Sequence, residues 1–287
     1  MIQDTQEFIP DEIVKVGNSL IQHGKWNDRV YIMKTTPDDC TNIINESKKL
    51  AQENDYSKIF AKIPFWAKEA FSKEKFETEA VIPRDEKSGG DILFMSLFLK
   101  EWRSQYCDYD TCKGILDSFE KEPPKSSKRN LPDRWTISKC TPEDAPEMAE
   151  VYKQVFRSYP FEIDNPEYIC QTMESNINYY CVKDEVGKII ALSSAELDPE
   201  SSCAEMSDFA TLPKARGNHC AGHLLGLMHE DVEESGICTP FTIARATSPA
   251  MNTVFARNGY IFGGTLKNNT HIGESLEDMN VWYLNKD

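Results

Sequence analysis

The stretch EMSDFATLPKARGNHCAGHLL, residues 205–225, decides the fold of this chain. It begins as a β-strand that ends near Pro213, continues through a short turn with Arg216 and Gly217, and enters an amphipathic helix at about Cys220. The unpaired N–H groups at the start of such a helix and the positive end of its dipole together predict an anion site. The stretch lacks G-x-x-x-x-G-K-[ST] and G-x-G-x-x-G, which excludes a Walker A loop and a dinucleotide fingerprint. Taken alone, it also fits an ordinary connection between a strand and a helix.

A second informative stretch is TIARATSPAMNTVFARNGY, residues 242–260. It predicts a strand and then a helix that carries Asn252 and Phe255 and ends at Gly259. Three strand candidates in a row precede or overlap the first stretch, with turn residues between them that are typical of hairpins. These strands span residues 179–183, 189–196 and 203–211.

In this order the two stretches resemble the GNAT superfamily of acyl-CoA-dependent N-acyltransferases. Members share a pyrophosphate loop R/Q-x-x-G-x-G/A, which matches residues 216–221, and a helix end N-x-x-[YF]-x-x-x-G-[FY], which matches residues 252–260. The resemblance covers roughly residues 135–287. It implies an α/β (α+β) protein whose C-terminal GNAT fold has a mixed, mostly antiparallel sheet flanked by helices, with acetyl-CoA as the acyl donor.

The likeness narrows to one family within this superfamily. The segments EMSDFATLP, TIARA and GGTLKNNTHIGESLEDMNVWY resemble the β-lysine N-acetyltransferase family, and NDRVYIMK at 27–34 and KIFAKIP at 58–64 extend the likeness through nearly the whole chain. The resemblance implies that acetyl-CoA and the small cationic amino acid β-lysine give Nε-acetyl-β-lysine, a compatible solute. Two alternatives stay open. The acceptor could be lysine, ornithine or a polyamine, or the chain could be an acetyl-CoA-binding module without catalysis.

The superfamily resemblance also implies which residues hold acetyl-CoA. The strand before the loop would hydrogen-bond pantetheine through its main chain, the loop would wrap the pyrophosphate, and Asn252 would contact pantetheine near the thioester sulfur. His219 stands where the family pattern has its first loop glycine, and we expect its Cβ to narrow the phosphate approach and to disfavour a positive φ. The implied cofactor-binding residues are Phe209, Ala210, Thr211, Arg216, Gly217, Asn218, His219, Cys220, Ala221, Asn252 and Phe255.

Amine acetylation needs a neutral amine, whereas an ε-ammonium has a pKa of about 10.4, so a base is expected. Glu205 stands where superfamily enzymes often have this carboxylate, on the strand before the loop. Asp208, three residues on, faces the opposite side if the strand is regular. Asp208 would then either orient the substrate or take the role of base itself.

The leaving thiolate is often protonated in the superfamily by a tyrosine four residues before the helix-ending glycine. The residue at that position is Phe255, so the usual acid is absent. Tyr260 or Tyr283 would substitute for it, although Tyr260 also fits a core position. Alternatively, the CoA thiolate leaves unassisted, which the moderate pKa of a thiol permits.

A cationic amino acid needs acidic groups near its amines and a hydrogen-bond donor at its carboxylate. The candidates beside the expected cleft are Glu196, Glu205, Asp208, Asn268, Asn269, Asn280 and Tyr283. The first half of the chain would form one wall of the pocket that binds the acceptor amine.

The pattern divides the chain into an N-terminal α/β domain of residues 1–120, a Pro- and Ser-containing linker of residues 121–134, and the acetyltransferase domain of residues 135–287. The first half reads β-α-β, which suggests a degenerate acyltransferase-like domain. We expect strands near 29–33, 57–63 and 79–82 and helices near 39–50 and 65–71. The apolar run that follows Asp91 and extends to Leu99 is expected to form one more helix.

Charge and cysteine usage restrict the function classes. The 287 residues include 47 acidic and 32 basic side chains, a net charge of −15, which argues against nucleic-acid and membrane partners. Nine cysteines at irregular spacing, without C-x-x-C, together with an acidic rather than basic N-terminal stretch, predict a cytoplasmic protein. His219 and His223 lack an evident third ligand, so no metal is expected. A homodimer stays open.

Overall fold

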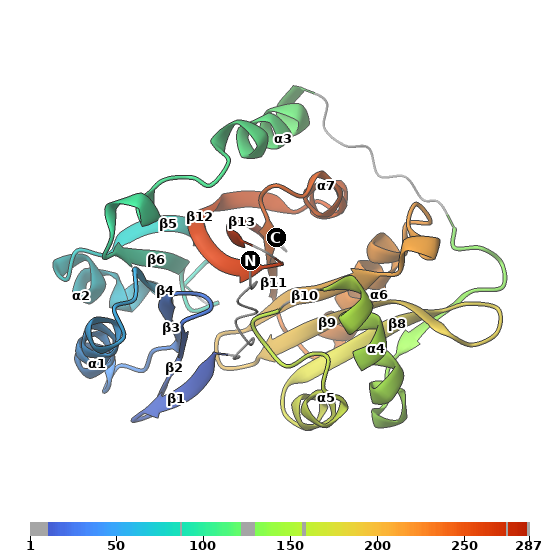
Figure 1. Cartoon of the computed structure of the whole chain (residues 1–287), viewed down its shortest axis with the longest axis horizontal. Helices are drawn as coiled ribbons and strands as arrows, with labels where there is room; N and C mark the ends of the chain where they lie inside the picture. The colour runs from blue at the N-terminus through green and yellow to red at the C-terminus, as the bar shows by residue number, and fades with distance from the viewer. Residues whose placement is uncertain (1–10, 87, 122–129, 157–158, 274, 286–287) are drawn as a thin grey trace, which may run out of the picture.

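The first half of the chain alternates strands and helices (Figure 1). The computed structural model describes residues 11–86, 88–121, 130–156, 159–273 and 275–285, so most of the expected linker lies outside the described residues. The elements of this half are β1 (Glu12–Val16), β2 (Ser19–Gly24), β3 (Arg29–Lys34), α1 (Cys40–Glu53), β4 (Lys58–Pro64), a 3-10 turn (Phe65–Ala67), α2 (Lys68–Lys73), β5 (Glu77–Ile82), β6 (Ile92–Phe98), a 3-10 turn (Glu101–Ser104) and α3 (Tyr109–Lys121).

One prediction for this half is wrong. The apolar run after Asp91 is not a helix but strand β6, whose first five residues are buried. It pairs with β4 on one side and with β5 on the other, so it is a central strand. A strand buried on both faces reads as a continuous apolar run, and periodicity alone does not distinguish it from a buried helix.

In the second half three consecutive strands, a helix from Cys220, a strand and a second helix follow one another as predicted. Two helices of this half begin at typical start signals, because Asn165 and Ser248 cap them with their side chains and Pro166 and Pro249 occupy the first helical position. The elements are β7 (Thr136–Lys139), a 3-10 turn (Pro142–Asp144), α4 (Ala145–Val155), α5 (Pro166–Met173), β8 (Ile177–Lys183), β9 (Ile189–Asp198), β10 (Cys203–Thr211), a 3-10 turn (Pro213–Ala215), α6 (Cys220–Glu234), β11 (Thr239–Arg245), α7 (Pro249–Arg257), β12 (Ile261–Ile272) and β13 (Ser275–Tyr283).

All these strands join in one mixed sheet, in the order β1-β2-β3-β4-β6-β5-β12-β13-β11-β10-β9-β8-β7. Pairing is antiparallel except between β3 and β4 and between β10 and β11. The halves meet where Gly264 of β12 pairs with Ala80 of β5. A Cβ at Gly264 would stand 2.3 Å from the carbonyl oxygen of Glu79, and its φ is +142°, so this close approach requires glycine.

The two halves repeat one topology. The first half runs β1-β2-β3-α1-β4-α2-β5-β6 and the second runs β8-β9-β10-α6-β11-α7-β12-β13. The strand orders, β1-β2-β3-β4-β6-β5 and β8-β9-β10-β11-β13-β12, also correspond, and in each half the third and fourth strands form the parallel pair. This correspondence supports the hypothesis that the first half is a degenerate copy of the second.

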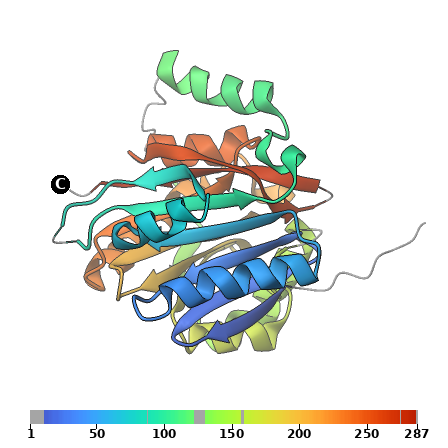
Figure 2. The ribbon, with the colours of Figure 1, turned by 90° about the vertical axis from the view of Figure 1, so that its left-hand side faces the viewer.

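Helices pack on the faces of the sheet in each half, and an apolar cluster lies where strands of the two halves face each other. Helices α1 and α2 pack on the first half, and Figure 2 shows α1 lying across its strands. In the second half α6 covers one face, and α4 and α5 cover the other. Burying one large apolar side chain contributes about 1.5–3 kcal/mol, so the apolar cluster between the halves holds them together. That cluster includes Phe60, Phe94, Phe241, Leu266 and Val281.

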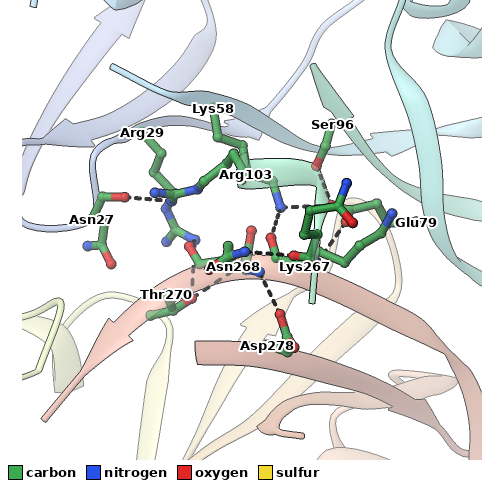
Figure 3. A network of polar contacts seen from close by, with 12 residues as sticks. Asn27, Arg29, Lys58, Glu79, Ser96, Arg103, Lys267, Asn268, Thr270 and Asp278 are labelled. Carbon is green, nitrogen blue, oxygen red and sulfur yellow. Dashed lines mark hydrogen bonds and ion pairs between the residues drawn. The ribbon is translucent and has the colours of Figure 1, made fainter. Parts of the chain in front are cut away.

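A polar network also joins the halves (Figure 3). Lys58 Nζ lies 2.8 Å from Glu79 Oε2, with the two side chains 0% and 2% exposed. This ammonium also donates to the Lys267 carbonyl oxygen at 2.7 Å, and the Lys267 amide donates to Glu79 Oε1 at 2.8 Å. The network therefore fixes the segment of β12 where the pairing with β13 shifts register, between Leu266 and Thr270.

Candidate active site

The site lies where two neighbouring strands separate. Strands β10 and β11 pair only over residues 203–205 and 239–241, so they part beyond Glu205. A cavity of about 1350 Å³ occupies the gap. It is lined at one end by the start of α6 and at the other by strands β2, β3 and β4 of the first half.

The loop before α6 offers backbone N–H groups to this cavity. Helix α6 begins without a side-chain cap and without an acidic residue in its first turn. Gly217 has a φ of 85° and His219 a φ of 58°, so both are left-handed. His219 thus adopts the conformation that its Cβ was expected to disfavour, which histidine tolerates better than most residues. Gly217, His219, Cys220 and Ala221 line the cavity, an arrangement that fits a diphosphate.

Two more residues shape this loop. The amide nitrogen of the Asn218 side chain donates to the Ala215 carbonyl oxygen at 3.1 Å, so Asn218 braces the turn and does not line the cavity. Arg216 lines the cavity, and its Nε donates to the Thr211 carbonyl oxygen at 3.3 Å. The guanidinium is therefore held beside the start of α6.

A β-bulge in β10 exposes main-chain groups next to this loop. The pairing with β9 shifts register between Ser207 and Ala210, which leaves the intervening residues out of the ladder. Phe209 lines the cavity and packs edge-on against Phe255, with ring centres 5.6 Å apart. Thr211 also lines the cavity, whereas the Ala210 side chain is buried in the core. Main-chain groups left out of the ladder beside these two aromatic rings fit an extended amide such as pantetheine.

The bulge also corrects the expectation for Asp208. In a regular strand Asp208 would face away from Glu205, but its φ is 53° and both carboxylates line the same cavity. The extra residue reverses the alternation of side chains, which brings Asp208 to the Glu205 side. Asp208 accepts hydrogen bonds from Ser194 Oγ at 2.6 Å and from the Tyr159 hydroxyl, so each of its oxygens is engaged.

The buried Asp208, two partly buried glutamates and one lysine set the electrostatics of the cavity. Burial raises the pKa of Glu205 to about 7, against the opposing effect of the Lys62 ammonium, with Asp208 adding to the rise. Burial and then the Glu205 and Asp208 charges raise the pKa of Glu196 to about 8. Burial raises the pKa of Asp208 as well, although its hydrogen bonds oppose the shift. The cluster therefore exchanges protons near neutral pH.

Asn252 lies outside the cavity, contrary to the expectation that it contacts pantetheine. It is 0% exposed, and its amide nitrogen donates to the carbonyl oxygens of Arg245 at 2.9 Å and Ser248 at 2.7 Å. Its Oδ1 accepts from Asn280 Nδ2 at 2.9 Å and from Trp282 Nε1 at 2.8 Å. The side chain is fully used within the fold, and its partner Asn280, expected beside the substrate, is equally buried.

Three further candidates also lie away from the cavity lining. Tyr260 is 4% exposed, its hydroxyl lies 2.8 Å from Nε2 of His229, and burial raises its pKa, so its position is the core position and not that of a thiolate acid. Tyr283 is buried in the sheet opposite Phe241. Asn268 sits in the β12 irregularity, where its Nδ2 donates to the Gln105 carbonyl oxygen at 2.7 Å.

Strands of the first half form one wall of the cavity, although the sequence did not predict which of their residues line it. Of the expected substrate residues, four line the cavity: Glu196, Glu205, Asp208 and Asn269. Residues that the sequence did not single out join them: Gln22, Arg29, Tyr31, Phe60, Lys62 and Tyr159. A usable signal was present, because KIFAKIP places Lys58 and Lys62 four positions apart on one face of an otherwise apolar strand, and RVYIMK begins with Arg29.

Other kinds of site find no support among the described residues. Those residues contain no group of three or more His, Cys, Asp and Glu side chains placed to hold a metal ion. No helix in the described part of the chain is long and apolar enough to cross a membrane. The nine cysteines, all described, are free thiols.

No family model matches the chain. Over 273 residues it is 34% identical to the β-lysine N(6)-acetyltransferase of Methanococcus maripaludis, and the match covers 95% of this chain and 98% of that protein. The chain belongs to the β-lysine N(6)-acetyltransferase family. A second member of this family, from Methanosarcina mazei, is 37% identical over 166 residues, which cover 58% of this chain and 60% of that protein.

The ribosomal-protein-S18-alanine N-acetyltransferase from Escherichia coli matches with a TM-score of 0.46 at 17% sequence identity. The match covers 52% of this chain and 92% of that chain.

Proposed function

We propose that this chain transfers the acetyl group of acetyl-CoA to the ε-amine of β-lysine, giving Nε-acetyl-β-lysine and CoA. The observation that carries the proposal is one cavity that joins the uncapped start of α6 to the partly buried Glu205, whose pKa is about 7. The names of the relatives from Methanococcus maripaludis and Methanosarcina mazei support β-lysine as the acceptor.

The second half would hold acetyl-CoA, which supplies an electrophilic thioester carbonyl. The first N–H groups of α6 and the Arg216 guanidinium would bind the diphosphate, because both are donors directed at one end of the cavity. Main-chain groups of the β10 bulge would hydrogen-bond the pantetheine amides, with Phe209 and Phe255 packed along the arm.

Glu205 would act as the base. With a pKa of about 7 it is largely ionised at slightly alkaline pH and can take a proton from the ε-ammonium. The amine nitrogen then forms a bond to the thioester carbon, and the carbon–sulfur bond breaks. The second proton lost by the nitrogen goes to the departing thiolate, which gives the amide and CoA. Asp208, held by Ser194 and Tyr159, would orient the ammonium and not take its proton, because its oxygens are already engaged.

Position 255 is a phenylalanine, and Tyr260 is bonded within the core. The CoA thiolate would therefore leave without a tyrosine acid from either position. A thiol with a pKa of about 8.5 is a good enough leaving group for this.

Acetylation removes one positive charge from β-lysine and leaves a net neutral zwitterion. A neutral solute can accumulate without a counterion, so we infer that the product serves as a compatible solute in the cytoplasm. Its cellular amount should rise with external salt.

The test is mass spectrometry of the product formed from acetyl-CoA and β-lysine, with fragmentation to locate the acetyl group on the ε-nitrogen. Lysine, ornithine and a polyamine run in parallel decide the acceptor by kcat/KM. If none of these amines is acetylated over a range of salt and pH, the proposal is wrong. Tight CoA binding without turnover would favour a binding module.

A further inference from the structure

Three buried polar side chains line the end of the cavity formed with the first half, and each has an atom without a hydrogen-bond partner. Gln22 of β2, Arg29 of β3 and Asn269 of β12 are 1%, 4% and 1% exposed. Among the described residues, the unpartnered atoms include both amide atoms of Gln22, Arg29 Nε and Asn269 Oδ1. Buried polar atoms are nearly always hydrogen-bonded, so several orphans at one place point to a ligand.

The strand register brings these side chains together. Gln22 pairs with Tyr31 and Gly24 pairs with Arg29, so Gln22, Tyr31 and Arg29 share one face of the sheet. Asn269 reaches the same place from the second half, because its carbonyl oxygen accepts a hydrogen bond from Arg29 Nη1. Arg29 Nη1 also donates to Thr270 Oγ1 at 3.1 Å (Figure 3).

The guanidinium of Arg29 has a free edge. Both of its hydrogen bonds to described residues come from Nη1, which leaves the parallel N–H groups of Nε and Nη2 available. That pair matches the two oxygens of a carboxylate. Asp11 affects Arg29 only at longer range, since no described carboxylate forms an ion pair with it. A buried cation without a paired anion is costly, and a ligand carboxylate would relieve that cost.

We propose that Gln22, Arg29 and Asn269 form a subsite for the amino-acid head group of the acceptor, with Arg29 binding its carboxylate. This inference rests on the proposed function and names the acceptor class: linear amino acids with a terminal amine. The Gln22 amide N–H donates to the same carboxylate, and Asn269 Oδ1 accepts from the ammonium group nearest to it.

The path from this subsite to the base fits such a molecule. Tyr31, Arg29 and Glu205 line the same cavity, and Tyr31 is close enough to both charged groups for each to affect its pKa. The Arg29 guanidinium carbon is 5.3 Å from the centre of the Tyr31 ring and 5.6 Å from that of Phe60. An aliphatic chain lying along these rings would place its amine at Glu205 and its carboxylate at Arg29. A polyamine, which has no carboxylate, would leave Arg29 unpaired.

The test compares β-lysine with 1,4-diaminopentane, which is the same molecule without its carboxylate. In the unaltered protein we expect kcat/KM to favour β-lysine by about 100-fold, because a buried charged donor discriminates strongly against a ligand that leaves it unpaired. Arg29→Gln should bring this ratio close to one. Arg134→Gln, an exposed arginine outside the cavity lining, is the matched control and should keep the ratio.

Gln22→Leu keeps the inference testable if Arg29→Gln does not fold. Both amide atoms of Gln22 lack partners, so leucine removes no hydrogen bond within the fold and should not lower the urea midpoint. We expect the β-lysine preference to fall by about 10-fold in this variant.

The outcomes separate the two proposals. Equal kcat/KM for the two amines in the unaltered protein, or an unchanged ratio in both variants, overturns the subsite and leaves acetyl transfer standing. If no amine is acetylated, the proposed function fails. Calorimetry then decides the subsite, because binding of β-lysine that is lost in Arg29→Gln supports it and absence of binding overturns it.

Discussion

The two halves of this molecule share a topology but differ at one turn, between the third strand of each repeat and the helix that follows. In the second half the residue before α6 is His219, the helix is uncapped, and its first turn faces the cavity. In the first half the residue before α1 is Asp39, whose carboxylate accepts hydrogen bonds from the Asn18 amide at 2.6 Å and from Thr36 Oγ1 at 2.8 Å. The same fold would therefore bind an anion at this turn in the second half, whereas in the first half the turn itself carries the Asp39 carboxylate.

This difference teaches that topology alone does not make a site. The strand–turn–helix unit supplies amide groups and a dipole, but the charge of the turn decides whether an anion can approach. The first half contributes instead through its inner sheet face, where Arg29, Tyr31 and Lys62 line the cavity. One repeat would thus bind the acyl donor, and the other would recognise the acceptor.

The largest effect should follow from removing the base in the second half. Glu205→Gln should lower kcat by about 10²- to 10⁴-fold, because a general base contributes about that factor. The base must be ionised to act and its pKa is about 7, so kcat/KM of the unaltered protein should rise with pH through about 7. That rise should be absent from the residual activity of Glu205→Gln, measured by CoA release.

Glu196→Gln is the matched control for this substitution, because Glu196 lies in the same cavity with a raised pKa of about 8. It should retain the pH-dependent rise. An unchanged rise in Glu205→Gln would instead make Asp208 the base.

A large effect on stability is expected at the joint between the halves. Lys58→Met leaves the buried Glu79 carboxylate without its cation and should lower the free energy of unfolding by about 3–5 kcal/mol. Adding Glu79→Gln removes the stranded charge, and the amide oxygen can still accept from the Lys267 amide, so the double variant should be more stable than Lys58→Met alone. Urea unfolding of both variants measures this, and equal stabilities would show that the pair is not coupled.

An intermediate effect should come from giving the second half the charge of the first. His219→Asp places a carboxylate at the start of α6, as Asp39 does at α1, and should raise the KM for acetyl-CoA by about 5- to 30-fold, since charge at a helix end is worth up to about 2 kcal/mol. His219→Asn is the control, because asparagine also tolerates the left-handed φ of 58° and is neutral. The same KM in both variants would refute a role for charge at this turn.

Local signals explain what the sequence predicted well. The start of α6 at Cys220 follows from the turn residues Arg216 and Gly217 just before it, and the start of α7 follows from Ser248 and Pro249. The hairpins of the second half follow from turn residues between alternating strands. The loop at 216–221 could be identified for the same reason, because its chemistry lies within six consecutive residues.

Long-range pairing explains what the sequence missed. The sequence predicts a helix at β6 because its apolar residues follow one another without interruption. Such a run indicates burial on both faces but has no periodicity that distinguishes a strand from a helix. Asp208 was placed on the wrong side because a bulge changes the alternation after Ser207 without changing the composition of the strand. The approach of Arg29 to Asn269, 240 residues apart, depends on the pairing of β5 with β12 at a glycine, which no local pattern predicts.

The smallest effect should come from removing the Asp39 carboxylate at the start of α1 in the first half. Asp39→Asn should leave the KM for acetyl-CoA unchanged, because Asp39 lies outside the cavity lining, and should slightly lower the urea midpoint at pH 7. Hydrogen bonds from the Asn18 amide and from Thr36 lower the pKa of Asp39. Because the pKa of Asp39 is lower in the folded protein, its carboxylate stabilises the fold at pH values above the unfolded-state pKa of about 3.9. This stabilisation is lost as the pH falls through the folded-state pKa. The difference in midpoint between the two proteins should therefore shrink below about pH 4, and a raised KM for acetyl-CoA in Asp39→Asn would mean that the two turns are not independent.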